Sequence, residues 1–133
     1  RNAIPRESKA IVAIDAVKEN NFLSETNALA NDIKLEYKTM EPELVVEVSK
    51  IDTPKSIMDL GVQEGLIRAI YAAWNGVYRM SPDIPDLVET SNNIARVIVK
   101  DGSIKNGCLT RSSVESSKID LSNTLRATFE LTG

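Results

Sequence analysis

The sequence of 133 residues contains no histidine and a single cysteine, Cys108. Imidazole and thiolate are the usual ligands of zinc and related metals, so the chain has almost nothing with which to build such a site. The same shortage excludes Ser-His and Cys-His nucleophile pairs. A hydrolytic site made only of these residues is therefore not expected, although a carboxylate-based or lysine-based site stays open. A single cysteine suits a reducing cytoplasm and does not exclude an extracellular location.

Positive charge is also scarce, because 16 Lys and Arg stand against 19 Asp and Glu. A net charge of -3 gives no general attraction to phosphate backbones or anionic lipid, so neither nucleic acid nor a membrane is an expected partner. No apolar run approaches the roughly 20 residues that span a bilayer, and the first residues lack the order of a signal peptide. The chain does hold 42% hydrophobic residues, enough for one buried core. We expect a single domain over residues 1–133.

Hydrophobic periodicity predicts three elements in the first half of the chain. Alternation of apolar and polar residues predicts strands over residues 4–15 and 44–49. Between them, apolar residues recur at helical spacing from 18 to 40, which predicts an amphipathic helix with one buried stripe.

The second half predicts a helix, two strands and a closing helix. The first helix ends at Asn75-Gly76, and Gly61 and Gly65 are expected to restrict it to its second half. After a turn-rich link, two strands within residues 88–113 meet at Asp101-Gly102, a strong hairpin signal. An apolar stripe predicts the last helix. The order β-α-β-α-β-β-α favours an α+β fold, an antiparallel sheet with helices packed on one face.

Three polar stretches are candidates for binding: "RNAIPRES" (1–8), "VETSNN" (88–93) and "LTRSS" (109–113). Each places Asn, Ser, Thr or Arg at the end of an apolar strand, where side chains can reach a ligand. Taken singly, each also reads as a loop end with turn or capping roles. A turn or capping role explains Arg111 less well, because the guanidinium of an arginine near the end of a strand can form two parallel hydrogen bonds to a carboxylate.

Taken together, "RNAIPRE", "NGVYRMSPDIPDLVETSNN" and "TRSS" resemble the aminoacyl-histidine dipeptidases, most strongly from Asn75 to Asn93. These belong to the dinuclear-metal peptidase superfamily, with carboxypeptidase G and the aminoacylases. The resemblance implies a parent protein whose catalytic domain holds two divalent metal ions, with zinc expected, and whose smaller lid domain covers the site. The chain resembles the ferredoxin-like lid only, incomplete at both ends, so Arg1 is expected to follow a cut inside it.

The same resemblance assigns roles to particular residues. Asn2 matches a lid asparagine that contacts a substrate or transition-state oxygen, although it also reads as a turn residue before Ile4-Pro5. Arg111 matches the arginine that anchors the C-terminal carboxylate of the substrate. Further candidates in the same motifs are Arg6, Asn92 and Ser112. No catalytic residue and no metal ligand is expected within the chain.

The function that this resemblance implies is that of a lid and substrate-recognition domain in a cytoplasmic, metal-dependent dipeptidase. The parent would hydrolyse Xaa-His and related dipeptides, and the 133-residue chain would be inactive alone. Its expected partners are the dipeptide, the catalytic domain of the same polypeptide and a second copy in a homodimer. Two alternatives stay open: a purely structural homodimerisation module, and a free-standing regulatory α+β domain that binds a small molecule.

Overall fold

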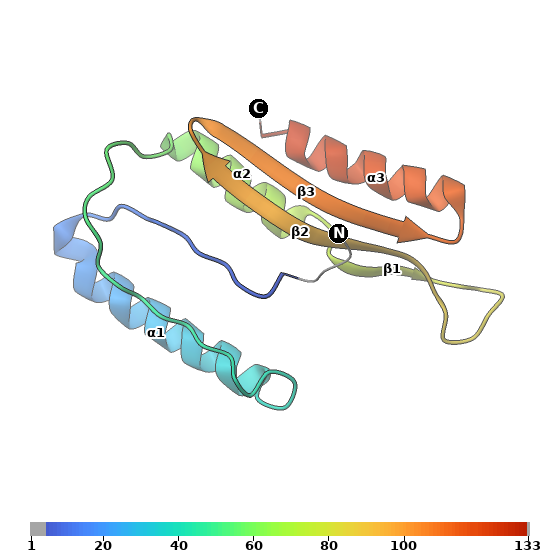
Figure 1. The fold of residues 1–133 in the computed structure, drawn as a ribbon, viewed down its shortest axis with the longest axis horizontal. Coiled ribbons are helices and arrows are strands. Elements are labelled where there is room, and N and C mark those ends of the chain that lie inside the picture. Colours follow the sequence, from blue (N-terminus) through green and yellow to red (C-terminus); the bar gives the residue numbers. More distant parts are fainter. Residues whose placement is uncertain (1–4, 133) are drawn as a thin grey trace. The chain divides into compact units, whose positions relative to one another are not determined.

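The computed structural model describes residues 5–132. The described elements are the 3-10 turn η1 (Ala16–Lys18), helices α1 (Glu19–Glu36), α2 (Leu60–Ala72) and α3 (Glu115–Glu130), and strands β1 (Gly76–Met80), β2 (Val88–Lys100) and β3 (Ser103–Ser112) (Figure 1). They fall into two compact units. One unit is Ala10–Ile57, and the other joins Arg1–Lys9 to Met58–Gly133.

The unit Ala10–Ile57 is built around α1, which confirms the helix expected over 18–40, with an earlier end. The Asp15 carboxylate accepts a hydrogen bond from the Val17 N–H at 3.2 Å and so begins the helical segment. After α1 the chain runs back along the helix, as Figure 1 shows, and Lys50 Nζ lies 3.0 Å from Glu19 Oε2. This exposed ion pair contributes little stability by itself.

The prediction of strands over residues 4–15 and 44–49 is wrong for the described residues, because neither segment forms a strand there. Alternation fixes which side chains share a face, but a strand also needs a backbone partner. Neither segment has a partner strand within residues 5–132, and Val12 and Val45 are 52% and 66% exposed. The described elements therefore follow the order α-α-β-β-β-α, while the α+β class itself is confirmed.

The three strands form one antiparallel sheet in the order β1-β2-β3. The predicted hairpin is confirmed: Lys100 pairs with Ser103, and Asp101 and Gly102 have φ values of 51° and 71°. Two consecutive residues with positive φ make the turn whose twist matches paired strands. The short strand β1 was not predicted, and it starts at Gly76, where a φ of 109° requires glycine.

Helix α2 is longer than the sequence suggested, because it contains both Gly61 and Gly65. The expected restriction to its second half is therefore wrong. The Asp59 carboxylate caps the helix by accepting from the Gly61 N–H at 2.9 Å and the Val62 N–H at 3.3 Å. A Cβ at Gly65 would lie 3.4 Å from the Thr132 side chain, an ordinary van der Waals distance, so the available space does not require glycine there. The cap at Asp59 offsets part of the low helix propensity of glycine, which is about 1 kcal/mol per residue.

The core of this unit lies between α3 and one face of the sheet. Leu121 is fully buried, Leu125 is 4% exposed, and Ala73 enters the same cluster from the end of α2. Ile94 of β2 and Phe129 pack against these residues. Both helices thus contribute to a core on a single face, which is the arrangement expected from the sequence.

Candidate functional site

Arg111 lies near the end of β3, directly opposite Ser91 of β2. Its side chain is exposed. The neighbouring Thr110 lines a pocket against α3 and therefore faces the helices. Because successive side chains of a strand point to opposite faces, Arg111 lies on the face of the sheet that α3 does not cover. A guanidinium held there can form two parallel hydrogen bonds to a carboxylate.

Asn92, another candidate, is buried on the helix-covered face. Its side-chain Nδ2 donates to the Trp74 carbonyl at 2.7 Å, and its Oδ1 accepts from Thr110 Oγ1 at 3.1 Å. The side chain is 3% exposed. Both ends of the amide are therefore engaged within the chain, which ties β2 to the end of α2 and to β3.

Ser112 has a similar internal role. Its Oγ lies 2.8 Å from Thr90 Oγ1, and it accepts a hydrogen bond from the Val114 N–H at 3.0 Å, just before α3. The N-cap residue of α3 is Val114, which has no side-chain cap. Ser112 instead stabilises the turn that leads from β3 into the helix.

The two remaining candidates, Asn2 and Arg6, lie near the start of the chain. Asn2 lies outside the described residues. Arg6 is exposed, in a segment without regular secondary structure. The structure therefore places Ser112 on the same strand as Arg111 and Asn92 on the neighbouring strand β2, with both side chains on the face opposite Arg111.

The sequence analysis included Glu89 and Thr90 in a candidate stretch without singling either of them out, and it did not consider Asn75. Glu89 and Thr90 are both buried, and the Asn75 Oδ1 accepts from the Ile94 N–H at 2.8 Å. One signal was available, since "VETSNN" places an acid and four neutral polar residues at the start of an apolar strand. Such a series in a buried strand indicates paired polar groups.

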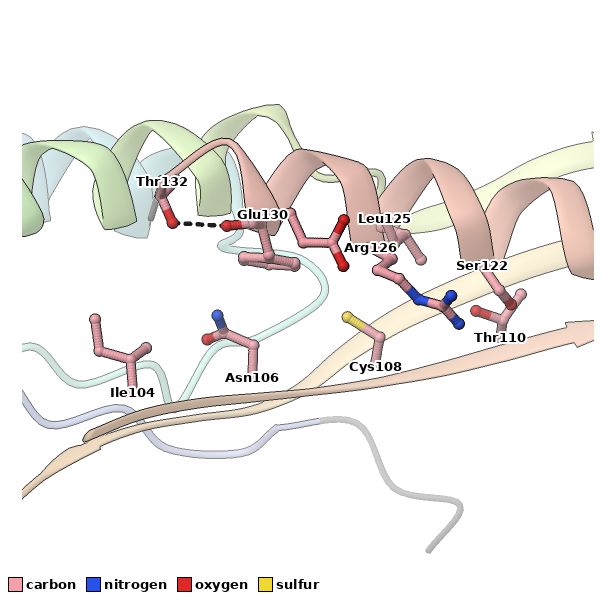
Figure 2. Close-up of a pocket in the computed structure, with 10 residues that line it drawn as sticks. Ile104, Asn106, Cys108, Thr110, Ser122, Leu125, Arg126, Glu130 and Thr132 are labelled. Atoms are coloured by element: carbon pink, nitrogen blue, oxygen red, sulfur yellow. Dashed lines mark hydrogen bonds between the residues drawn. The ribbon is translucent and has the colours of Figure 1, made fainter.

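A pocket of about 550 Å³ lies between α3 and β3, as Figure 2 shows. Its lining residues are Ile104, Asn106, Cys108, Thr110, Ser122, Leu125, Arg126, Phe129, Glu130 and Thr132. In Figure 2, Arg126 and Glu130 extend from α3 above Asn106 and Cys108 of β3. The lining mixes apolar groups with charges of both signs and contains none of the residues predicted to bind a ligand.

The thiol of Cys108, on β3, is expected to react with alkylating reagents at a rate that depends on pH. The residue is exposed as a whole, but burial around its sulfur raises the pKa of the thiol, and a hydrogen bond with Asn92 opposes that rise. We therefore expect slow alkylation by iodoacetamide at neutral pH, with a rate that still increases above the ordinary thiol pKa of about 8.5. Peptide mass spectrometry at a series of pH values measures the rate.

The same pKa shift predicts the sign of a stability change. The folded state holds the thiol proton more tightly than the unfolded state, so this contribution to stability is complete below the unfolded pKa. It is lost as the pH rises through the folded pKa. A pH profile of alkylation that coincides with the profile in denaturant would contradict both expectations.

Within residues 5–132, no group of three or more Cys, Asp or Glu side chains is arranged to hold a metal ion. In the same part of the chain, no helix is both long and apolar enough to cross a bilayer.

Comparison with known proteins confirms the resemblance that the motifs indicated. No family model matches the chain. The cytosol non-specific dipeptidase of Escherichia coli (strain K12) is 33% identical over 118 residues, which are 89% of this chain and 24% of that protein. The crystal structure of aminoacylhistidine dipeptidase from Vibrio alginolyticus matches 89% of this chain, with a TM-score of 0.84 and 26% identity. The chain spans about a quarter of the length of each relative.

Proposed function

Starting from this similarity to one part of two dipeptidases, we propose that the chain is the lid and substrate-recognition domain of a metal-dependent dipeptidase. Residues 1–133 would form one lid domain of a cytoplasmic enzyme that hydrolyses Xaa-His and related dipeptides. The position of Arg111 carries the proposal: an exposed arginine near the end of β3, on the face that α3 does not cover. The E. coli relative is itself named as a cytosolic protein.

In this proposal Arg111 binds the C-terminal carboxylate of the dipeptide. A guanidinium is always charged and offers its donors in a planar fork, so it fixes both the position and the orientation of the carboxylate. Asn2 would donate an amide N–H to the oxygen that becomes negative during peptide hydrolysis, without adding charge near the reacting carbonyl. Arg6 is a further candidate for contact with the substrate.

The proposed roles of Asn92 and Ser112 follow from their hydrogen bonds. Both are engaged inside the chain, on the face opposite Arg111. We assign them to positioning the strand rather than to contact with the substrate.

The catalytic domain is proposed to lie elsewhere in the same polypeptide. Two divalent metal ions there, with zinc expected, would polarise the scissile carbonyl and activate water. The chain itself has no histidine to supply to such a site. What its own residues can contribute is binding and orientation of the dipeptide, and exclusion of water when the lid closes.

Hydrogen exchange tests this proposal in the full-length protein. A dipeptide analogue with a CH2–NH group in place of the scissile amide should slow exchange in peptides covering residues 109–113. The cause would be a carboxylate bound by Arg111, which holds the end of β3 in place. Peptides from α1 serve as an internal comparison. Unchanged exchange at residues 109–113 under saturating analogue would contradict the proposal.

A structural homodimerisation module is the second candidate function. Among the described strands, β1 and β3 are the edges of the sheet, and a free edge is a ready site for pairing with another chain. Sedimentation of the full-length protein separates the two candidates. A purely structural module predicts association that is indifferent to the dipeptide analogue, together with full activity after Arg111→Ala.

A further inference from the structure

One buried carboxylate connects three elements at the end of the sheet where Arg111 lies. The Glu89 side chain is 3% exposed, and its Oε1 lies 3.3 Å from Arg79 Nε. The same oxygen accepts hydrogen bonds from Thr90 Oγ1 and Ser117 Oγ, each at 3.2 Å. A buried charge is tolerated only when it is paired and hydrogen-bonded, so these three groups determine where the carboxylate lies.

The partners of Glu89 come from different elements. Arg79 is on β1, Thr90 follows Glu89 on β2, and Ser117 is in the first turn of α3. Arg79 Nη1 also donates to Ser117 Oγ at 3.4 Å, which closes a small network. The network therefore fixes β1 and the start of α3 relative to the start of β2.

From this network, hydrogen bonds continue to the residues that follow Arg111. Thr90 Oγ1 lies 2.8 Å from Ser112 Oγ, and the Ser113 N–H donates to the Glu89 carbonyl at 3.0 Å. Thr110, which precedes Arg111, is held to β2 by its hydrogen bond to Asn92. The strand is thus fixed on both sides of Arg111, while the arginine itself points to the other face.

We infer that Glu89 is a positioning residue for Arg111, acting with Arg79 and Ser117 through the hydrogen bonds of Thr90 and Ser112. The inference rests on the proposed function, in which Arg111 binds the carboxylate of a dipeptide. A bidentate contact between a guanidinium and a carboxylate depends on the direction of both groups as well as on their distance. A small shift of the strand that carries Arg111 therefore weakens this contact. Glu89 does not touch the substrate, and its effect is limited to the group that Arg111 binds.

The test compares two inhibitors in the full-length protein: the CH2–NH dipeptide analogue as a free acid, and the same analogue as its C-terminal amide. Only the free acid offers Arg111 a carboxylate. Glu89→Gln keeps the size of the side chain but removes its charge. We expect it to raise the inhibition constant of the acid roughly tenfold and to leave that of the amide unchanged.

Three further variants make the result specific. Ser117→Ala is a milder change in the same network and should shift the acid in the same direction by a smaller factor. Glu115→Gln makes the same chemical change at an exposed glutamate of α3, whose partner is Lys118, and should change neither inhibition constant. In an Arg111→Ala background, Glu89→Gln should add nothing to the loss of acid binding.

The outcomes separate this inference from the proposed function. If Arg111→Ala removes the preference for the acid, but Glu89→Gln and Ser117→Ala affect acid and amide equally or not at all, the positioning role is refuted and the proposed function stands. If Arg111→Ala leaves the preference for the acid unchanged, the proposed function fails first. A misfolded Glu89→Gln protein leaves Ser117→Ala to decide between these outcomes.

Discussion

Arg111→Ala in the full-length protein should raise KM for a Xaa-His dipeptide and lower kcat/KM by roughly 30-fold or more. In the proposed function, the substitution removes a charged contact that water would not replace once the lid closes. Losing such a contact costs about 2 to 5 kcal/mol, and the lower value corresponds to the 30-fold change. Steady-state kinetics over a range of dipeptide concentrations measures both quantities.

Arg96→Ala is the matched control for this experiment. Arg96 is an exposed arginine on β2, toward the hairpin, and its loss removes the same charge from the same sheet. We expect less than a twofold change in kcat/KM, since exposed charges away from the contact contribute little. Equal losses for Arg96→Ala and Arg111→Ala would point to general charge rather than a specific anchor, and unchanged kinetics for Arg111→Ala would remove the assignment.

Leu121→Ala should open α3 to solvent. Leu121 has no exposed surface, and it packs with Leu125 and Ala73 in the cluster that holds α3 on the sheet. Truncating a buried leucine to alanine costs about 2 to 5 kcal/mol, because apolar burial is lost and a cavity remains. Exchange of the α3 amides in the full-length protein should therefore become at least roughly 30-fold faster.

Ile119→Ala is the control on the same helix. Ile119 is 52% exposed, so its truncation removes little buried surface. We expect a change below about 1 kcal/mol in the free energy of opening. Similar acceleration in both variants would contradict the packing described for Leu121, because it would show that burial of this side chain does not determine the stability of α3.

Local sequence signals predicted the elements whose formation depends on neighbouring residues. The hairpin at Asp101-Gly102 forms because these two residues accept the positive φ values that the turn demands. Helix α3 forms where Leu121, Leu125 and Phe129 recur on one stripe. In each case the pattern itself contains the cause of the structure.

Elements that depend on distant partners were less predictable. The segments over 4–15 and 44–49 alternate like strands, yet no partner strand pairs with their described residues. Strand β1 is the reverse case: its pattern was overlooked, but the start of β2 supplies a partner for its backbone. Helix propensity alone marks Gly61 and Gly65 as weak points of α2, because the cap at Asp59 is not apparent from propensity.

The candidate site was also predictable only in part. Motifs singled out Arg111, Asn92 and Ser112, but the sequence could not tell which face of the sheet each would occupy. The register of β3 on β2 separates them, with Arg111 on the open face and the other two under α3. Glu89 was not recognised because its importance arises from Arg79 and Ser117, which are distant in the sequence and close in the fold.

Hydrolysis of a Xaa-His dipeptide, measured in parallel for the full-length protein and for the isolated 133-residue chain with added zinc, tests the central claim most directly. We predict turnover by the full-length protein and none by the chain, because in the proposed function the chain would contribute recognition and the remaining polypeptide the metal-assisted chemistry. Turnover by the isolated chain, or a full-length protein without dipeptidase activity, would contradict the proposed division of labour.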